Sequence, residues 1–345
     1  MTELCGLTLS QPLLDLGAGF HSELRPQPLH NPRLVRFDPD TARLLGLPAS
    51  AHEDDAFVPL FSGNRLPAGC RPLALDYAGH QFGHFNPFLG DGRVVVLGSV
   101  DTPQGPLEIS VKGAGRTPYA RDLDGRAGLT ECLHEFSACR RLTELGIPAA
   151  RGLCVIAGDE QVDRGGFEPA AVLVRVAPSH IRFGTFENQY FRRDADALRR
   201  LADYLIAHHY RARVEQSPEA PHAALLRAMV EDSARLIARW QAAGFVHGMM
   251  NTDNQSAVGI TLDLGASAFT ETHDDGFVAS PQDDKGRYAF GRQPLIGLWN
   301  CNVLARALSP LLPAAALRAA VSAYEPEYLR AYAALAGEHA PGGER

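Results

Sequence analysis

The residues best suited to chemistry lie in one short stretch, from Asn251 to Asp263. Within it, Asp253 is followed directly by Asn254, and a short apolar run separates this pair from the carboxylate of Asp263. Mg²⁺ prefers oxygen ligands, keeps several waters, and is usually held by one or two protein carboxylates together with substrate phosphates. Two oxygen ligands and one further aspartate that can act as a base therefore predict a site for a nucleotide-bound metal.

A glycine pair and a strand lysine upstream also suggest phosphate binding. Gly90 and Gly92 precede a β-branched run, where their backbone could approach a phosphate closely; an ordinary turn is the alternative. Lys112 ends an alternating run, and Glu135 lies near the middle of the helix expected next. Protein kinases hold the α- and β-phosphates with a strand lysine paired to a helix glutamate. The alternatives are an edge-strand charge for Lys112 and a solvated position for Glu135.

Two arginines, Arg175 and Arg182, flank the point where the composition changes from strand-rich to helical. The planar guanidinium matches phosphate oxygens in a bidentate way and stays charged at every relevant pH. The pair is therefore predicted to clamp distal phosphates, with surface salt bridges as the alternative.

Two histidines, His80 and His84, stand four residues apart, but no third ligand of matching spacing lies nearby. A structural role is favoured over zinc binding. By analogy, His247 could orient the loop that contains Asp253.

The elements that would position these residues change character near Pro178. Before it, the patterns predict a hairpin, a helix and two further strands, at residues 93–100 and 107–112, 129–145, and 152–157 and 170–176. After it, helical patterns dominate, at residues 197–210, 223–243 and 313–336, with one strand expected at 257–262. Asp253 and Asn254 would then lie in the loop before that strand, and Asp263 in the loop after it.

The order of these parts is that of a protein kinase. It runs from glycine loop to strand lysine, helix glutamate, the Asp-Asn loop, a strand and a second aspartate. We therefore predict a two-lobed, kinase-like α+β fold, with a small mixed β-sheet lobe and a mainly helical lobe. Residues 1–75 are expected to form an extension packed on the core, 76–178 the nucleotide-binding sheet lobe, and 179–345 the helical lobe with the catalytic and metal loops.

The composition of the chain argues against several classes of protein. A formal net charge of -7 over 345 residues argues against a nucleic-acid binder of the basic-patch kind. The six cysteines form no C-x-x-C pair, which fits neither a zinc site nor a disulfide framework. No apolar run has membrane-spanning length, and the first residues lack the pattern of a signal peptide. A cytoplasmic protein without nucleic-acid or membrane partners is expected.

From about Asn31 to the neighbourhood of Trp299, the chain resembles the selenoprotein O family of pseudokinase-like protein adenylyltransferases. The motifs that carry the resemblance are Asp76-Tyr-Ala-Gly-His-Gln-Phe-Gly83, Leu89-Gly-Asp-Gly-Arg93, Lys112-Gly-Ala-Gly-Arg-Thr-Pro-Tyr119, Asp124-Gly-Arg126, Leu145-Gly-Ile-Pro148, Val174-Arg-Val-Ala-Pro-Ser-His-Ile-Arg-Phe-Gly184, Asn251-Thr-Asp-Asn254 and Gly286-Arg-Tyr-Ala-Phe-Gly291.

The resemblance implies that Asp253 is the general base and that Asn254 and Asp263 bind Mg²⁺ or Mn²⁺. It also implies nucleotide contacts from Gly90, Gly92, Arg93, Lys112, Asp124, Gly125, Arg175, Arg182 and Asp263, with Glu135 holding Lys112. ATP would bind flipped relative to ordinary kinases, so that AMP is transferred to Ser, Thr or Tyr hydroxyls of proteins, or to the chain itself, and pyrophosphate leaves. A phosphoryl-transferring enzyme and a catalytically inactive nucleotide-binding scaffold are the alternatives.

The chain departs from the family pattern in three places. The run Leu264-Gly-Ala-Ser-Ala-Phe269 stands where relatives usually have a Tyr-Gly-Pro-Phe-Gly-Phe-like run, and residues 278–285 lack the family's histidine. Relatives also continue through a substantial C-terminal region, so a shortened C-terminus is expected here.

Overall fold

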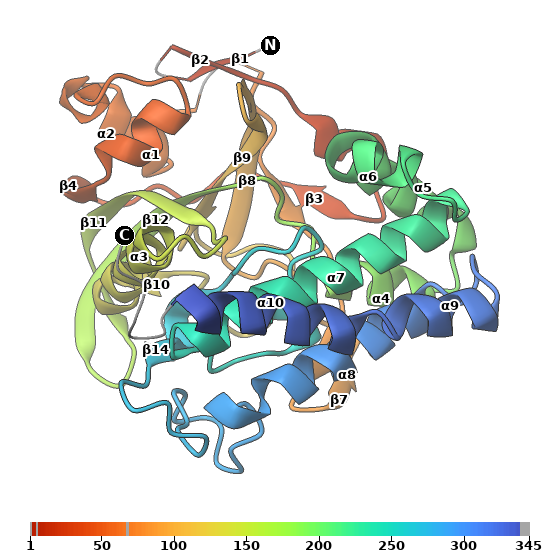
Figure 1. The fold of residues 1–345 in the computed structure, drawn as a ribbon. Coiled ribbons are helices and arrows are strands. Elements are labelled where there is room, and N and C mark those ends of the chain that lie inside the picture. Colours follow the sequence, from red (N-terminus) through yellow and green to blue (C-terminus); the bar gives the residue numbers. More distant parts are fainter. Residues whose placement is uncertain (1, 5, 67–68, 339–345) are drawn as a thin grey trace. The chain divides into compact units, whose positions relative to one another are not determined.

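The computed structural model describes residues 2–4, 6–66 and 69–338, and the chain forms two compact units of an α+β protein (Figure 1). The first unit comprises residues 1–77, 88–143 and 149–180, and the second comprises 78–87, 144–148 and 181–345. Two short segments, 78–87 and 144–148, thus lie between segments of the first unit in sequence but belong to the second unit. The polar tail after Glu338 lies outside the described residues.

The first unit is built on one sheet with the strand order β3-β5-β8-β9-β12-β11-β4, and β10 pairs with β12. Its elements are β1 (Thr2–Leu4), β2 (Leu7–Leu9), β3 (His21–Glu23), β4 (Arg33–Phe37), α1 (Pro39–Leu44), α2 (Phe57–Phe61), β5 (Leu73–Leu75), β8 (Val94–Thr102), β9 (Gly105–Lys112), β10 (Ala127–Gly128), α3 (Leu129–Glu144), β11 (Arg151–Asp163) and β12 (Phe167–Ala177). Every strand pairing described in this sheet is antiparallel, and the sheet has eight strands, so it is larger than the small mixed sheet expected.

The central strands of this sheet are buried on both faces. In β12, Val172, Val174 and Val176 belong to one hydrophobic cluster, which includes residues of α1 and α2. The alternate residues Ala171 and Leu173 belong to a second cluster, which includes Cys132 and Phe136 of α3. Side chains alternate between the faces of a strand, so one apolar run supplies both clusters.

Residues 1–75 also contribute to the sheet itself. Strand β3 pairs with β5, and β4 pairs with β11, so this segment supplies strands as well as the helices α1 and α2. The three-part division of the chain predicted above stays a prediction.

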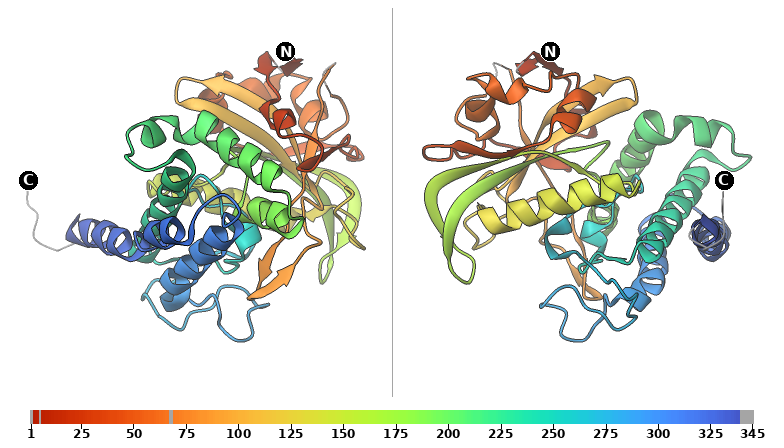
Figure 2. Two further views of the ribbon diagram at one scale, coloured as in Figure 1. Left: turned by 90° about the vertical axis from the view of Figure 1, so that its right-hand side faces the viewer. Right: turned by 60° about the vertical axis from the view of Figure 1, so that its left-hand side comes forward.

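The second unit is mainly helical (Figure 2). Its elements are β6 (Gly79–Gln81), β7 (His84–Asn86), α4 (Phe183–Phe191), α5 (Ala195–Leu205), a π-helical turn (Ile206–Tyr210), α6 (Arg211–Glu215), α7 (Pro221–Ala242), β13 (Phe245–Val246), β14 (Ala268–Phe269), α8 (Gln293–Ala307), α9 (Ala314–Val321) and α10 (Tyr324–Glu338). The long helix α7 contacts α8, α9 and α10. The predicted α+β class, with a sheet lobe and a helical lobe, is confirmed.

Several local predictions differ from the structure, and β11 and β12 are longer than the strands expected at 152–157 and 170–176. Residues 257–262 form no strand: Gly259 takes a φ of +66° in a turn, and only the isolated bridge between Gln255 and Thr261 remains. The helix expected at 313–336 is two helices, α9 and α10, interrupted at residues 322–323. The strands β8 and β9 extend further toward each other than predicted, because Thr102 pairs with Gly105 and leaves a two-residue turn.

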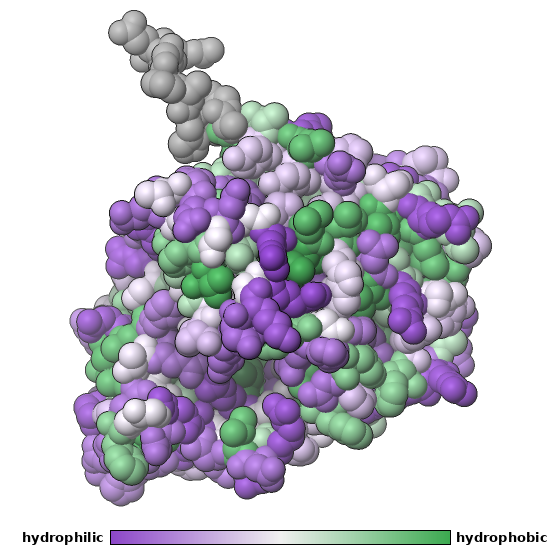
Figure 3. Space-filling model, turned by 90° about the horizontal axis from the view of Figure 1, so that it is seen from below, coloured by the Kyte–Doolittle hydropathy of each residue, from purple (hydrophilic) through white to green (hydrophobic). Residues whose placement is uncertain are grey.

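Apolar side chains are also exposed on the helical unit. Leu295 is 69% exposed, Leu329 56% and Tyr332 38%. The space-filling view shows hydrophobic residues gathered in several places among hydrophilic ones (Figure 3).

Within the described residues, no helix combines the length and apolar character needed to cross a membrane.

Candidate active site

In the first unit, the side chain of Lys112 lies at the end of β9 and reaches two glutamates of α3. Its Nζ atom is 2.5 Å from Oε2 of Glu135 and 2.8 Å from Oε1 of Glu131. The two glutamates are four residues apart, which places them on the same face of the helix. The side chains of Lys112 and Glu135 are 6% and 1% exposed, so this ion pair is formed away from water.

Glu131 is a residue that the sequence analysis missed. Both of its oxygens accept from the guanidinium of Arg93, at 2.9 and 2.7 Å, so Glu131 lies between Arg93 and Lys112. Burial alone would raise the pKa of this carboxyl, but the charges of Lys112 and Arg93 lower the pKa to about 2. Its spacing of four residues before Glu135 was the signal that could have identified it.

Arg175 lies on the other side of Glu135. It sits on β12, which pairs with β9, and its Nη1 donates to Oε1 of Glu135 at 3.0 Å. Its side chain has no exposed surface. Arg175 therefore fixes the carboxylate that holds Lys112, and direct contact with a nucleotide stays a prediction.

The five side chains of this cluster carry three positive and two negative charges. The cations are Lys112, Arg93 and Arg175, and the carboxylates are Glu131 and Glu135. Such an excess of positive charge in a largely buried setting favours an anion such as phosphate.

The glycine loop is fixed by its own packing. Gly90 has a φ of +113°, and a Cβ atom on it would lie 2.6 Å from the ring of Tyr119. Between the glycines, Asp91 is buried and accepts from the backbone N–H of Leu75 and the hydroxyl of Tyr77, each at 3.1 Å. This packing already requires glycine at position 90, and the phosphate contacts of Gly90 and Gly92 stay a prediction.

Asp124 and Gly125 lie in a second loop of the first unit. Oδ1 of Asp124 accepts from the backbone N–H of Arg126 at 2.9 Å and from Arg164 at 2.6 Å. Burial opposes the effect, but Arg164 and these hydrogen bonds lower the pKa of Asp124. The carbonyl of Gly125 accepts from the N–H of Gly115 at 3.0 Å. The nucleotide contacts predicted for Asp124 and Gly125 stay predictions.

In the second unit, Asp253 occupies a short 3-10 helix, Thr252–Asn254, and is buried. Its Oδ2 atom accepts a hydrogen bond from Nε2 of Gln81 at 3.0 Å, while its buried Oδ1 atom has no hydrogen-bond partner among the described residues. Burial raises the pKa of Asp253 to about 6, against the lowering effect of the Gln81 hydrogen bond. The contact from Gln81 was not predicted from the sequence, although Gln81 lies in a motif that was singled out.

Arg182 joins the two aspartates of this loop region. Its Nη1 donates to the carbonyl oxygen of Asp253 at 2.8 Å and also contacts Oδ2 of Asp263. Asp263 has a left-handed backbone with a φ of 55°. One guanidinium nitrogen thus holds both segments together, and the predicted clamp on distal phosphates stays a prediction for Arg182.

The oxygen donors near Asp253 suit a hard cation. The side-chain N–H₂ of Asn254 donates to the carbonyl of Met249 at 3.0 Å, so its Oδ1 atom is the group left to accept. On the neighbouring Asp253, the buried Oδ1 atom has no hydrogen-bond partner among the described residues. Such atoms are unusual in folded proteins, and a bound cation or substrate would give this one a partner. In the described part of the chain, no three His, Cys, Asp or Glu side chains form a metal-holding group. Mg²⁺ does not require one, because waters and phosphates complete its shell.

His247 and His80 have structural contacts. The Nε2 atom of buried His247 lies 2.8 Å from the carbonyl oxygen of Leu262, the residue before Asp263, so it ties together the two ends of the loop region. His80 contacts Glu187 through Nδ1, and its ring lies 5.3 Å from that of Trp299. His84 is exposed. The contacts of His80 favour the structural role predicted for it, and the role of His84 stays a prediction.

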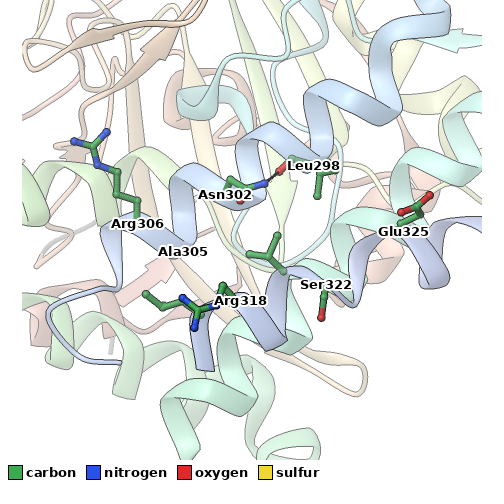
Figure 4. A pocket seen from close by; sticks show the side chains of 9 residues that line it. Leu298, Asn302, Ala305, Arg306, Arg318, Ser322 and Glu325 are labelled. Atoms are coloured by element: carbon green, nitrogen blue, oxygen red, sulfur yellow. Dashed lines mark hydrogen bonds between the residues drawn. The ribbon is translucent and has the colours of Figure 1, made fainter. Parts of the chain in front are cut away.

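A hollow in the second unit lies among α8, α9 and α10 (Figure 4). It is lined by Leu298, Asn302, Ala305, Arg306, Leu317, Arg318, Val321, Ser322 and Glu325. None of these is a predicted site residue, and the amide of Asn302 is occupied with the carbonyl of Leu298 in its own helix at 2.9 Å. The candidate active site is therefore not in this hollow.

Comparison with known proteins gives a consistent result. The family model described as "Protein adenylyltransferase SelO" matches residues 3–339. The chain is 44% identical over 333 residues to "Protein nucleotidyltransferase YdiU" of Pseudomonas aeruginosa, covering 96% of this chain and 68% of that protein. It is also 44% identical over 315 residues to the protein of the same name from Erwinia tasmaniensis, covering 91% of this chain and 65% of that one.

Among solved structures, "WaaP in complex with acyl carrier protein" matches with a TM-score of 0.25 and 15% sequence identity, covering 72% of this chain and 86% of that one. A TM-score this low carries no argument about fold or function.

Proposed function

Because this chain belongs to the protein adenylyltransferase SelO family of nucleotidyltransferases, we propose that it transfers AMP from ATP to Ser, Thr or Tyr hydroxyls of proteins. The acceptor oxygen forms a bond to the α-phosphorus, and the bond from that phosphorus to the bridging oxygen breaks. Pyrophosphate leaves with the electron pair of the broken bond, and the acceptor's proton passes to a base of the enzyme.

The observation that carries the proposal is the carboxylate of Asp253. One oxygen accepts from Gln81, and the other is buried without a partner in the described chain. General bases work best when their pKa lies near the working pH, and burial has raised the pKa of Asp253 to about 6. The unpartnered oxygen is thus suited to accept a proton from a hydroxyl group.

The remaining residues of the proposal act on charge. Arg93 and Lys112 neutralise phosphate oxygens, with Glu135 and Arg175 fixing Lys112 in place. Asn254 and Asp263 would hold Mg²⁺ or Mn²⁺, which supplies positive charge to the phosphates and orients them. ATP bound with its α-phosphate toward the acceptor gives AMP transfer, and the opposite orientation gives phosphoryl transfer.

Two sources of acceptor hydroxyls belong to the proposal: other proteins and the chain itself.

A cytoplasmic setting is also part of the proposal. The cysteines that the structure describes, Cys70, Cys132, Cys139, Cys154 and Cys301, are free thiols, which suits a reducing compartment.

The test is incubation of the purified chain with Mg²⁺ and ATP labelled at either the α- or the γ-phosphate, with and without a cell lysate. Transfer of the α-label to protein, and an intact mass increased by one AMP, is the expected result. Label transferred from the γ-position alone would replace adenylylation by phosphoryl transfer. ATP binding without transfer of either label would favour the inactive scaffold.

A further inference from the structure

The hairpin formed by β6 and β7, residues 79–86, lies against the loop that contains Asp253. The hairpin belongs to the helical unit, although it occurs between β5 and β8 of the sheet in sequence. Three successive hairpin residues contact three successive loop residues. The contacts run from His80 N–H to Thr252 Oγ1 at 2.7 Å, from Gln81 Nε2 to Asp253 Oδ2 at 3.0 Å, and from Phe82 N–H to Asn251 Oδ1 at 3.1 Å.

We propose that Gln81 is a positioning residue, which fixes the carboxylate of Asp253 so that its Oδ1 atom is directed at the acceptor hydroxyl. This inference rests on the role proposed above for Asp253. The carboxylate can otherwise rotate about its Cβ–Cγ bond and exchange its two oxygens. A hydrogen bond to one oxygen removes that freedom and keeps the other available for a proton.

The chemistry of an amide suits this task. The N–H₂ group of Gln81 donates without carrying charge, so it orients the carboxylate while weakening its basicity less than an arginine or lysine would. Correct orientation matters because small misplacements of a reacting group reduce the rate steeply.

The backbone of the hairpin is built closely around Asp253. A Cβ atom on Gly79 would lie 2.9 Å from the Cβ of Asp253, so only glycine allows β6 to come this near. At the turn, Phe82 has a φ of +50°, which is costly for a residue other than glycine. Its N–H is held by Asn251 Oδ1 and by the hydroxyl of Tyr288 at 2.9 Å. The contacts of the loop and of Tyr288 thus hold the strained turn in place.

The test compares Gln81→Met with His84→Ala. Methionine has nearly the length of glutamine but cannot donate a hydrogen bond. His84 is exposed and lies opposite Gln81 in the same hairpin, so it serves as the matched control. We expect Gln81→Met to lower kcat for transfer at least about 10-fold, with KM for ATP and Tm near their original values. His84→Ala should leave all three unchanged.

Two results would overturn the inference. One is an unchanged kcat in Gln81→Met. The other is a loss of activity that comes with a raised KM for ATP or a lowered Tm, which would show that Gln81 only supports the fold. Since the comparison is made with whichever label the wild type transfers, phosphoryl transfer in place of AMP transfer would refute the proposed function and leave this test intact.

If the chain transfers neither label, a spectroscopic measurement still tests the contact between Gln81 and Asp253. The side-chain amide signal of Gln81, assigned by its disappearance in Gln81→Met, should shift in Asp253→Ala and stay in place in His84→Ala. An amide signal that is the same with and without the carboxylate of Asp253 would refute the contact on which the inference depends.

Discussion

At the scale of single residues, environment divides the carboxylates of this protein into two kinds. Asp253 is buried, the described residues place no cation on its side-chain oxygens, and burial raises its pKa to about 6. Glu131 is largely buried between Lys112 and Arg93, and its pKa falls to about 2. The first can accept a proton near neutral pH, while the second stays charged and serves to pair the cations.

The role of Asp253 is tested by Asp253→Asn, which keeps the size of the side chain and removes its basicity. We expect AMP transfer to fall by about 10²- to 10⁴-fold, the usual contribution of a general base. ATP binding, measured by calorimetry, should persist because the cations of the first unit are unchanged. Transfer at the original rate would assign the base to another group.

Glu131 leads to a prediction about stability and pH. Its pKa is lower in the folded protein than its ordinary value of 4.5, so its ion pairs stabilise the fold fully above about pH 4.5. That stabilisation is lost as the pH falls toward about 2, where the folded-state carboxylate takes up its proton. Urea unfolding of Glu131→Gln should therefore show a shallower loss of stability between these pH values than the wild type. Parallel curves would mean that Glu131 is not paired in solution.

Glu131 also occupies the two cations expected to bind phosphate. A phosphate group that reaches Arg93 and Lys112 must compete with this carboxylate, so Glu131→Gln should bind ATP more tightly than the wild type under conditions where both are folded. Calorimetric titration gives the comparison, and weaker binding would instead indicate that Glu131 holds the cations in position for the nucleotide.

At the scale of elements, the ion pair depends on a strand and a helix meeting at one point. β9 delivers Lys112 and α3 delivers Glu135, while β12 beside β9 delivers Arg175 to the same carboxylate. Hydrophobic contacts set this arrangement: the Ala171 and Leu173 face of β12 packs with Cys132 and Phe136 of α3. The local patterns predicted the strand and the helix, but the packing of their apolar faces determines where the charges meet.

A double-mutant cycle tests this pair. Lys112→Met leaves the buried carboxylate of Glu135 without its nearest cation, and Glu135→Gln leaves the buried ammonium of Lys112 with Glu131 as its remaining carboxylate among the described residues. Breaking a buried pair from one side costs about 3 kcal/mol or more of unfolding free energy. The double variant should cost less than the two single variants together, since neither Lys112 nor Glu135 then remains as a buried charge without the other. Strict additivity would show that the pair does not interact.

One predicted element, the strand at 257–262, is not formed. The apolar run 257–262 was expected to be a strand, yet its backbone groups bond to distant segments. The N–H of Ala257 donates to the carbonyl of Ile181, and that of Thr261 to the carbonyl of Pro148, each at 2.9 Å. The placement of Asp253 and Asn254 before the run, and of Asp263 after it, does not depend on its being a strand.

At the scale of the whole molecule, the proposed site residues are distributed over both compact units. Arg93, Lys112 and Glu135 belong to the first, whereas Arg182, Asp253 and Asp263 belong to the second. Residues 78–87 belong to the helical unit, although the segments before and after them belong to the first unit. This short segment supplies Gln81, which contacts Asp253.

A ligand that binds only the folded protein raises its stability by mass action. Mg²⁺ with ATP at 100 times its Kd should add about 2.7 kcal/mol, seen as a rise in Tm. Chelation of the metal, or the change Asp263→Ala, should remove most of this rise because the phosphates then lack their metal. A rise that is the same with chelator present would contradict the metal role of Asn254 and Asp263.

The sequence by itself determined which side chains are proposed to carry the chemistry and in what order the elements follow. Helical spacing, strand alternation and the breaks at glycine and proline are local properties, so α3, α7 and the strands β8 and β9 could be predicted within a few residues. The specific motifs identified the family, and with it the aspartates and the asparagine of the loop.

Only the tertiary structure decided the partners of those side chains. Glu131 lies between Arg93 and Lys112, Arg182 joins Asp253 to Asp263, and Gln81 reaches Asp253 across 172 residues of sequence. Such contacts depend on how buried apolar faces bring distant segments together, and no local pattern records that. The same contacts set the charge and orientation of each group, so they determine what the residues found in the sequence can do.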